Sequence, residues 1–95
     1  MANEAKASGS TPIVPHEHIV FTDLDGTEGV LVDLHAKSFY RLNETAVLVW
    51  RGLEQNATIE EILNKMTLRY DVAADQAASS VDRLLRSFQT YRLVH

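Results

Sequence analysis

The sequence contains no cysteine, which excludes disulfides, thiol nucleophiles, zinc–thiolate sites and iron–sulfur clusters. It has no apolar run long enough to cross a membrane, and residues 1–12 lack the apolar stretch of a signal peptide. Basic residues are few: nine Lys and Arg against 13 Asp and Glu give a net charge of -4. An acidic chain has no broad attraction for nucleic acid or anionic lipid. We therefore expect a cytoplasmic protein with no membrane or nucleic-acid partner.

What is present is one small folded unit. A chain of 95 residues, 45% of them hydrophobic, fits a single domain. Folding of a chain this size buries roughly 60–65% of the unfolded surface. Residues 1–12 are small, polar and unpatterned, so we expect a disordered tail there, with the domain over residues 13–95.

Three short stretches in the first half have the alternation and spacing of strands. They cover residues 18–23, 29–34 and 39–42. Asp25, Gly26 and Gly29 supply turn chemistry between the first two, and residues 35–38 form a second short turn. This close spacing predicts an antiparallel three-stranded meander.

The second half carries the start signals and spacing of three helices. Asn43 is a good N-cap for the first, and Thr58 with Glu61 forms a capping box for the second. The third runs from about Ala74 to Tyr91. The predicted buried faces are Ala46, Val47, Trp50 and Leu53, then Ile59, Ile62, Leu63, Met66 and Tyr70, then Ala77, Val81, Leu84, Leu85 and Phe88. Three strands followed by three helices predict an α+β fold that is winged helix-turn-helix-like.

The string D-L-D-G-T at residues 23–27 matches the nucleophile motif of haloacid-dehalogenase phosphatases, with Asp23 attacking and Asp25 handling protons. In that class the motif follows a buried parallel strand of a large doubly wound sheet. Here Gly29 leads straight into another strand, and Asp and Gly are typical of hairpin turns. We interpret the string as a turn and predict no catalytic residue and no enzyme activity.

His16 and His18 form H-E-H, which could direct two imidazoles from one strand face towards a metal. A metal site needs a third or fourth ligand, and only His35 and His95 remain as histidines. We interpret the pair as an exposed strand start and predict neither a metal nor a cofactor.

A winged helix often binds DNA, and the third helix carries Arg83, Arg86 and Arg92. It also carries aspartates, and the wing sequence D-L-D-G-T-E places three carboxylates where phosphates would lie. The arginines therefore fit a solvated helix face, or a patch for an acidic peptide, better than a DNA contact. A winged-helix DNA-binding or protein-interaction module stays the alternative function.

The order of motifs from residue 19 to residue 94 is more specific than any single motif. A strand ending in Y-R-L-N leads into E-T-A-V-L-V-W, T-I-E-E-I opens a second helix, and Y-D-V leads to a third. This series resembles the PqqD-like family, named for protein D of pyrroloquinoline quinone biosynthesis. The L-Y-P-E-G of quinone-pathway members is absent, their glycine before the final L-V is Arg92, and their acidic residue before Val81 is Ser80. These departures favour the broader family, which includes stand-alone proteins of lasso-peptide pathways.

The resemblance implies a domain that recognises the leader segment of ribosomally made, post-translationally modified peptides. The leader would add as a strand to the edge at residues 37–42, with its apolar side chains in a cleft against the third helix. It would then be presented to a maturation enzyme, such as a radical S-adenosylmethionine enzyme or a leader peptidase. The implied edge residues are Lys37, Ser38, Phe39, Tyr40 and Arg41, and the implied cleft wall is Val81, Leu84, Leu85 and Phe88.

Alternatives remain within this expected site. Leu85 and Phe88 fit the core beneath the sheet as well as they fit a groove. Arg83 and Arg86 are further candidates for pairing with leader carboxylates, as are Lys37 and Arg41. Backbone groups of an edge strand point alternately to the sheet and to the open side, and the register with the second strand decides which residues face outwards. The sequence also leaves monomer and dimer open.

Overall fold

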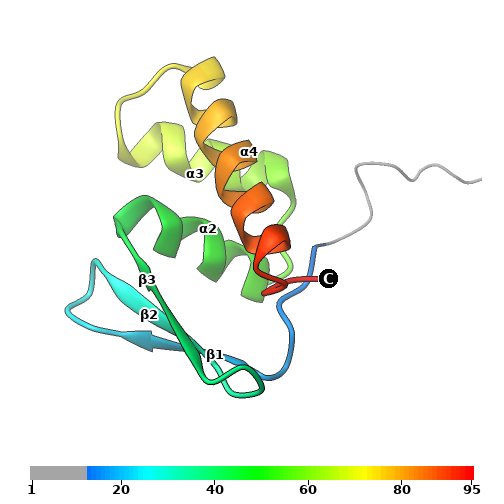
Figure 1. Ribbon diagram of the computed structural model, residues 1–95. Coiled ribbons are helices and arrows are strands. Elements are labelled where there is room, and N and C mark those ends of the chain that lie inside the picture. Colours follow the sequence, from blue (N-terminus) through cyan, green and yellow to red (C-terminus); the bar gives the residue numbers. More distant parts are fainter. Residues whose placement is uncertain (1–12) are drawn as a thin grey trace, which may run out of the picture.

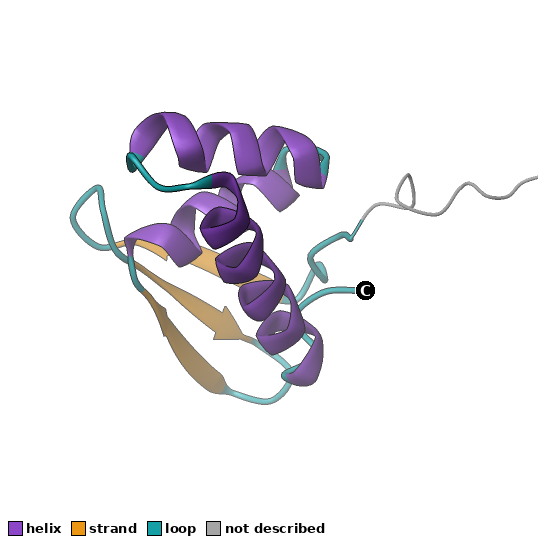
Figure 2. Cartoon of the chain, turned by 90° about the horizontal axis from the view of Figure 1, so that it is seen from above, coloured by secondary structure: helices purple, strands orange, loops and turns teal. Residues whose placement is uncertain are grey.

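The computed structural model describes residues 13–95, so the tail expected at residues 1–12 lies outside the described residues. The elements follow in the order β1 (Ile19–Asp23), β2 (Gly29–Asp33), β3 (Ser38–Leu42), α2 (Glu44–Glu54), α3 (Ile59–Arg69) and α4 (Ala74–Thr90). The strands form one antiparallel sheet in the order β1-β2-β3, and the helices stack on one of its faces (Figures 1 and 2). The predicted α+β order of three strands and three helices is confirmed.

The β1–β2 turn explains the D-L-D-G-T string. The Asp23 carboxylate accepts the N–H of Gly26 at 2.7 Å, and Gly26 has a φ of 91°, which glycine adopts without strain. The Asp25 carboxylate accepts the N–H groups of Glu28 at 2.9 Å and Thr27 at 3.0 Å, and these bonds lower the pKa of Asp25. Both carboxylates therefore hold the turn together, which confirms that the string is a turn.

The first two helices begin at the predicted capping residues. The Asn43 side chain accepts the N–H of Ala46 at 3.0 Å. Thr58 accepts the N–H of Glu61 at 3.1 Å, and the Glu61 carboxylate accepts the N–H of Thr58 at 2.8 Å. Each bond satisfies an N–H that has no partner within the helix. No helix in the described part of the chain is long and apolar enough to cross a membrane.

Helices α2 and α4 end in the same way but with different residues. After α4, Arg92 has a left-handed φ of 58°, its N–H bonds to the carbonyl of Gln89 at 3.0 Å, and the N–H of Leu93 bonds to the carbonyl of Phe88 at 2.8 Å. Asn56 holds the same position after α2, with a φ of 59°. This Schellman pattern usually places glycine at the left-handed position. Asparagine tolerates that conformation, whereas arginine is strained there.

The core lies between the sheet and the helices and centres on Trp50, whose ring meets the Phe88 ring edge to face at 5.2 Å. The largest fully buried side chains are Trp50, Leu31, Leu53, Ile62, Leu93, Val49 and Val81. The prediction for α2 missed Val49, which is buried in the core, whereas Val47 is half-buried and packs against the core. Both valines lie within one turn of Trp50, so the packing of α2, and not its periodicity, selects between them.

The two ends of the described chain lie side by side. Val14 and His95 exchange two backbone hydrogen bonds, at 2.9 Å and 2.8 Å, and the N–H of His16 donates to the carbonyl of Leu93 at 3.1 Å. Pro15 and Val94 are the paired residues of this antiparallel bridge. The bridge holds the segment before β1 against the segment after α4.

The bridge also gathers all four histidines. The His16 ring stacks on His95 at 4.3 Å and on His18 at 5.0 Å, and His18 stacks on His35 at 3.9 Å, between ring centroids. The prediction that His16 and His18 mark an exposed strand start is therefore wrong, because both are half-buried in this column. Residues 13–95 contain no group of three or more His, Cys, Asp or Glu side chains that could hold a metal ion.

Candidate functional site

Within residues 13–95, β3 is the last strand of the sheet and no strand pairs with its outer edge. The hydrogen-bond pattern between β1 and β2 shows which backbone groups of β3 point away from the sheet and lack a partner strand. The N–H of Leu34 donates to the carbonyl of His18 at 3.0 Å, and the N–H of Leu24 donates to the carbonyl of Glu28 at 3.0 Å. Antiparallel ladders alternate between bonded and non-bonded pairs. Between the His18–Leu34 pair and the Leu24–Glu28 pair, every second residue pair of β1 and β2 is therefore hydrogen-bonded too. Val32 of β2, paired with Val20, is one of the bonded residues.

The register carries this alternation across to β3. Because Val32 bonds to β1, its neighbour Leu31 directs its N–H and C=O to β3, where it pairs with Tyr40. Tyr40 is thus tied into the ladder, as are the residues two positions away. Phe39 and Arg41 lie between these positions, so their N–H and C=O groups point to the open side. These are the groups that an added strand would bond.

Successive side chains of β3 point to opposite faces of the sheet. Tyr40 is half-buried on the helix side, and its ring lies 5.2 Å from the ring of Tyr91, directly after α4. Phe39 is 74% exposed on the face that the helices leave open. Lys37 and Ser38 lie where the β2–β3 turn enters the strand, and Lys37 has a left-handed φ of 57°. Tyr91 was not predicted as a site residue, although it follows Phe88 by three positions and so shares its side of the helix.

A hollow of about 330 Å³ lies between the end of β3 and α4. Its apolar lining is Leu42, Ala46 and Leu84. At its rim the Arg41 guanidinium donates to the Glu28 carboxylate at 2.9 Å, and this bond raises the pKa of Arg41. The hollow thus opens beside the free edge of β3, and we call the two together the β3–α4 groove.

The predicted wall of α4 is only partly open to this groove. Leu84 is half-buried and lines it, whereas Val81, Leu85 and Phe88 are 2%, 9% and 3% exposed and belong to the core. A molecule in the groove would therefore meet Leu84 first, with the three core side chains forming the support beneath it. Leu42 and Ala46 were missed as lining residues, because their place in the groove depends on how β3 and α2 meet α4.

The candidate charged residues fall into two groups. Arg41 is paired with Glu28, and Arg86 is paired with Asp82 one turn earlier in α4 at 3.0 Å. Lys37 and Arg83 have no carboxylate within ion-pair distance in residues 13–95. Lys37 and Arg83 are therefore the candidate cations that could pair with an acidic group of a ligand without first breaking an ion pair.

Fold and groove together define a small winged-helix-like domain with one sheet edge open beside its last helix. The sequence profile of the family described as "Coenzyme PQQ synthesis protein D (PqqD)" matches residues 28–94. The chain therefore belongs to the PqqD family, as its motif order predicted.

Two solved structures have the same fold. One is described as "TbiB1 in Complex with the TbiA(beta) Leader Peptide", with a TM-score of 0.81 and 22% identity over 86% of this chain and 94% of that chain. The other, "Lasso peptide synthetase B1 complexed with the leader peptide", has a TM-score of 0.81 and 20% identity over 90% of this chain and 99% of that chain. No curated protein matches the sequence.

Proposed function

We propose that this protein binds the leader segment of a ribosomally made precursor peptide by strand addition to β3 and presents it to a maturation enzyme, without catalysis of its own. The observation that carries the proposal is the β3–α4 groove, in which the outward backbone groups of Phe39 and Arg41 adjoin a hollow lined by Leu84. Family membership supports it, and so do the leader peptides named for the two structures of the same fold.

Backbone pairing alone is too weak for this function. Phe39 and Arg41 each offer one N–H and one C=O, and four hydrogen bonds would contribute only ~2–6 kcal/mol. A micromolar complex requires about 8 kcal/mol net, and the peptide must also lose conformational freedom on binding. The leader must therefore place at least one apolar side chain in the groove.

The hollow fits one such anchor. In an added strand every second side chain faces the helices, as Tyr40 does in β3. A leucine-sized or aromatic side chain over Leu42, Ala46 and Leu84 would contribute about 1.5–3 kcal/mol through burial. Tyr40 and Tyr91, in contact with each other, offer a second apolar surface further along the edge.

Charge would set the direction and selectivity of the leader more than its affinity. Lys37 and Arg83, which have no internal partner in the described residues, are placed to attract leader carboxylates. Exposed ion pairs contribute only about 0–1 kcal/mol each. Arg41 and Arg86 would first have to leave Glu28 and Asp82, so we assign them a smaller part.

The enzyme that receives the leader would be a radical S-adenosylmethionine enzyme or a leader peptidase, and the complex would form in the cytoplasm. The alternative of DNA binding is disfavoured by the turn carboxylates of Asp23 and Asp25, which lie in the wing.

An NMR titration tests the proposal. The isotope-labelled chain is titrated with synthetic leaders of candidate precursor peptides, with scrambled leaders of the same composition, and with a short DNA duplex. We expect saturable shifts along residues 37–42 and around Leu84 with the true leader only. Equal shifts with the scrambled peptide would refute leader recognition, and salt-sensitive saturation by the duplex would favour the DNA-binding alternative.

A further inference from the structure

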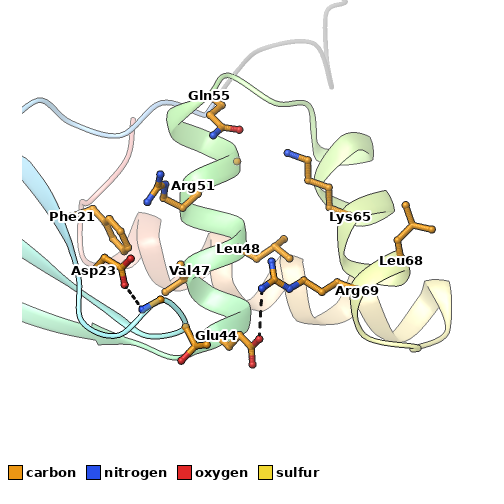
Figure 3. Close-up of a pocket in the computed structure, with 13 residues that line it drawn as sticks. Phe21, Asp23, Glu44, Val47, Leu48, Arg51, Gln55, Lys65, Leu68 and Arg69 are labelled. Atoms are coloured by element: carbon orange, nitrogen blue, oxygen red, sulfur yellow. Dashed lines mark hydrogen bonds and ion pairs between the residues drawn. The ribbon is translucent and has the colours of Figure 1, made fainter.

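A second and larger hollow, of about 490 Å³, opens away from the β3–α4 groove, where the β1–β2 turn, α2 and α3 meet (Figure 3). We call it the α2–α3 cleft. Its apolar lining includes Val47, Leu48 and Leu68, and its basic lining is Arg51, Lys65 and Arg69. The function proposed above uses none of these six side chains.

The cleft and the groove lie on different sides of α2. A residue turns by about 100° along a helix, so Val47 and Arg51 project from one side while Ala46 and Trp50 project from another. Ala46 lines the groove and Trp50 lies in the core, whereas Val47 and Arg51 line the cleft. A peptide on β3 would therefore leave the α2–α3 cleft free for another molecule.

The cleft is preformed by the close approach of its helices. A Cβ atom on Gly52 would lie 2.7 Å from Cγ1 of Ile62, closer than real Cβ contacts occur, so the glycine lets α3 approach α2 at this point. On the β1 side the Arg51 guanidinium lies over the ring of Phe21, 5.2 Å from its centroid. Such walls need little rearrangement to receive a ligand.

The cleft exposes an apolar anchor point. Leu68 is 87% exposed at its rim, and Leu48 and Val47 are half-buried in its floor. Single exposed leucines are common on protein surfaces. Here the leucine borders a hollow with an apolar floor, which is the arrangement that receives an aliphatic side chain of a partner.

Charge in the cleft favours an acidic ligand although the whole chain carries a net charge of -4. Lys65 has no carboxylate within ion-pair distance in the described residues, and in Figure 3 its side chain extends from α3 towards α2. Arg69 reaches Glu44 at 3.9 Å and Arg51 pairs with Glu54 at 3.4 Å, so among the described residues Lys65 is the lining cation left without an ion pair. The other lining acid, Asp23, already accepts the N–H of Gly26.

We propose that the α2–α3 cleft is a second docking site, which binds an acidic segment with a leucine-like anchor on the maturation enzyme. That the partner is the maturation enzyme rests on the proposed function; the preference for an acidic, aliphatic segment rests only on Leu48, Leu68 and Lys65. A nucleic acid would satisfy the cations but has no aliphatic group for the floor. The domain would thus hold the leader on one side of α2 and the enzyme on the other.

The test uses a defined probe, the peptide acetyl-Glu-Asp-Leu-Leu-Asp-Glu-amide, titrated into the labelled chain of 95 residues. Controls are the same peptide with Lys in place of its four acidic residues, and with Ser in place of its leucines. We expect saturable shifts confined to residues 21–27, 44–55 and 59–69, which line the cleft or adjoin its lining, with the acidic leucine peptide. Shifts located elsewhere, or equal binding of the Lys peptide, would overturn the proposal.

Matched variants separate the cleft from general surface effects. Lys65→Gln should weaken binding of the probe roughly two- to fivefold, the effect of one exposed charge, whereas Gln76→Glu makes the same change in net charge on α4 and should have no effect. Leu68→Ser should weaken it roughly tenfold through lost apolar burial, whereas Leu34→Ser, in the β2–β3 turn, should not. Unchanged binding in both cleft variants, with thermal melts like that of the wild type, would refute the site.

A final titration keeps this proposal and the proposed function apart. The probe should bind the leader-saturated chain as tightly as the free chain, because the two sites lie on different sides of α2. If the leader fails to bind and the probe still binds the cleft, the proposed function falls and the acidic docking site stands. If the leader displaces the probe, the two share one site and the cleft proposal is wrong.

Discussion

The two edges of the sheet differ in what they offer a partner. On β3, the backbone groups of Phe39 and Arg41 face the open side next to an apolar hollow. On β1, the outward N–H of Ile19 already donates to the carbonyl of His16 at 3.1 Å, and Arg51 lies over the ring of Phe21. Exposed strand edges invite unwanted pairing unless something blocks them. The start of the β1 edge is therefore occupied by the chain itself, whereas among the described residues the edge of β3 is open.

The hollows beside these two edges also differ, in their charge and in the kind of ligand they suit. In the β3–α4 groove the cation at the rim is neutralised by a carboxylate, and the floor is apolar, which suits an extended backbone with one anchor. In the α2–α3 cleft Lys65 lacks such a partner among the described residues, which suits recognition through side chains. A domain of this size can thus present two chemically distinct surfaces without a second core.

The largest expected effect comes from proline substitutions on β3. Residues whose N–H bonds to β2 and residues whose N–H points to the open side should respond differently. Tyr40→Pro removes an N–H that bonds to β2 and should lower the free energy of unfolding by about 3 kcal/mol. Phe39→Pro removes an outward N–H, so it should fold with a loss of about 1 kcal/mol or less and bind the leader at least tenfold more weakly. Urea titrations and calorimetry on both variants measure the two quantities. Wild-type leader affinity in a folded Phe39→Pro variant would show that the leader does not pair with this edge.

The second prediction concerns the cleft alone. Gly52→Ala places a methyl group against Ile62 and should cost about 1–3 kcal/mol of stability through overpacking. It should change the amide shifts of α2 and α3 and leave leader affinity within a factor of two. Ile62→Ala removes the clashing atoms, so the double variant should lose less stability than the two single variants together. Additive losses would show that the two residues are not in contact.

The third prediction concerns the pH dependence of stability that arises from His16, which lies before β1. Desolvation lowers the pKa of His16, and the nearby imidazoles of His95 and His18 lower it further, while Asp33 opposes the shift. Because the folded-state pKa lies below the unfolded value of 6.5, the unfolded state takes up protons first as the pH falls. Stability should therefore decrease from pH 7.5 to pH 5.5.

Urea midpoints across this pH range give the measurement, and His16→Gln provides the control. The Asp33 carboxylate adds no slope between these values, because its lowered pKa lies below its ordinary 3.8. The decrease should be smaller in His16→Gln, which has one imidazole fewer in the column. A wild-type midpoint that rises as the pH falls would contradict the prediction.

The smallest expected effect concerns the helix that walls the groove. Arg92→Gly should raise the free energy of unfolding by about 1 kcal/mol, because glycine adopts the left-handed conformation without strain. Asn56→Gly, at the same position after α2, should gain only a few tenths of a kcal/mol, since asparagine already tolerates that φ. Denaturation curves compare the pair. A gain at Asn56 as large as that at Arg92 would mean that strain at the arginine is not the cause.

Local chemistry made the fold predictable from the sequence. The caps at Asn43 and Thr58 and the turn at Asp25-Gly26 each depend on residues within four positions, and all three are confirmed. The choice between Val47 and Val49 was missed because one helical period admits both. The stacking of the histidines was missed because it depends on the pairing of the two chain ends.

The candidate site was predictable in outline and not in detail. The edge strand could be identified from the order of motifs. That the backbone N–H and C=O of Phe39 point to the open side follows only from the register with β2. Leu84 reaches the groove while Leu85, its neighbour, faces the core, a distinction that a helical stripe does not make. The α2–α3 cleft left no mark in the sequence, because it joins the β1–β2 turn to helices more than fifteen positions away.

The bridge between Pro15 and Val94 bears on how this domain can be joined to other proteins. A unit whose chain enters and leaves at one corner can be inserted into a surface loop of a larger protein without stretching either connection. Such an insertion would leave both the free edge of β3 and the α2–α3 cleft uncovered, since neither lies at the bridge. The paired ends are therefore compatible both with a separate subunit and with a module built into a larger protein.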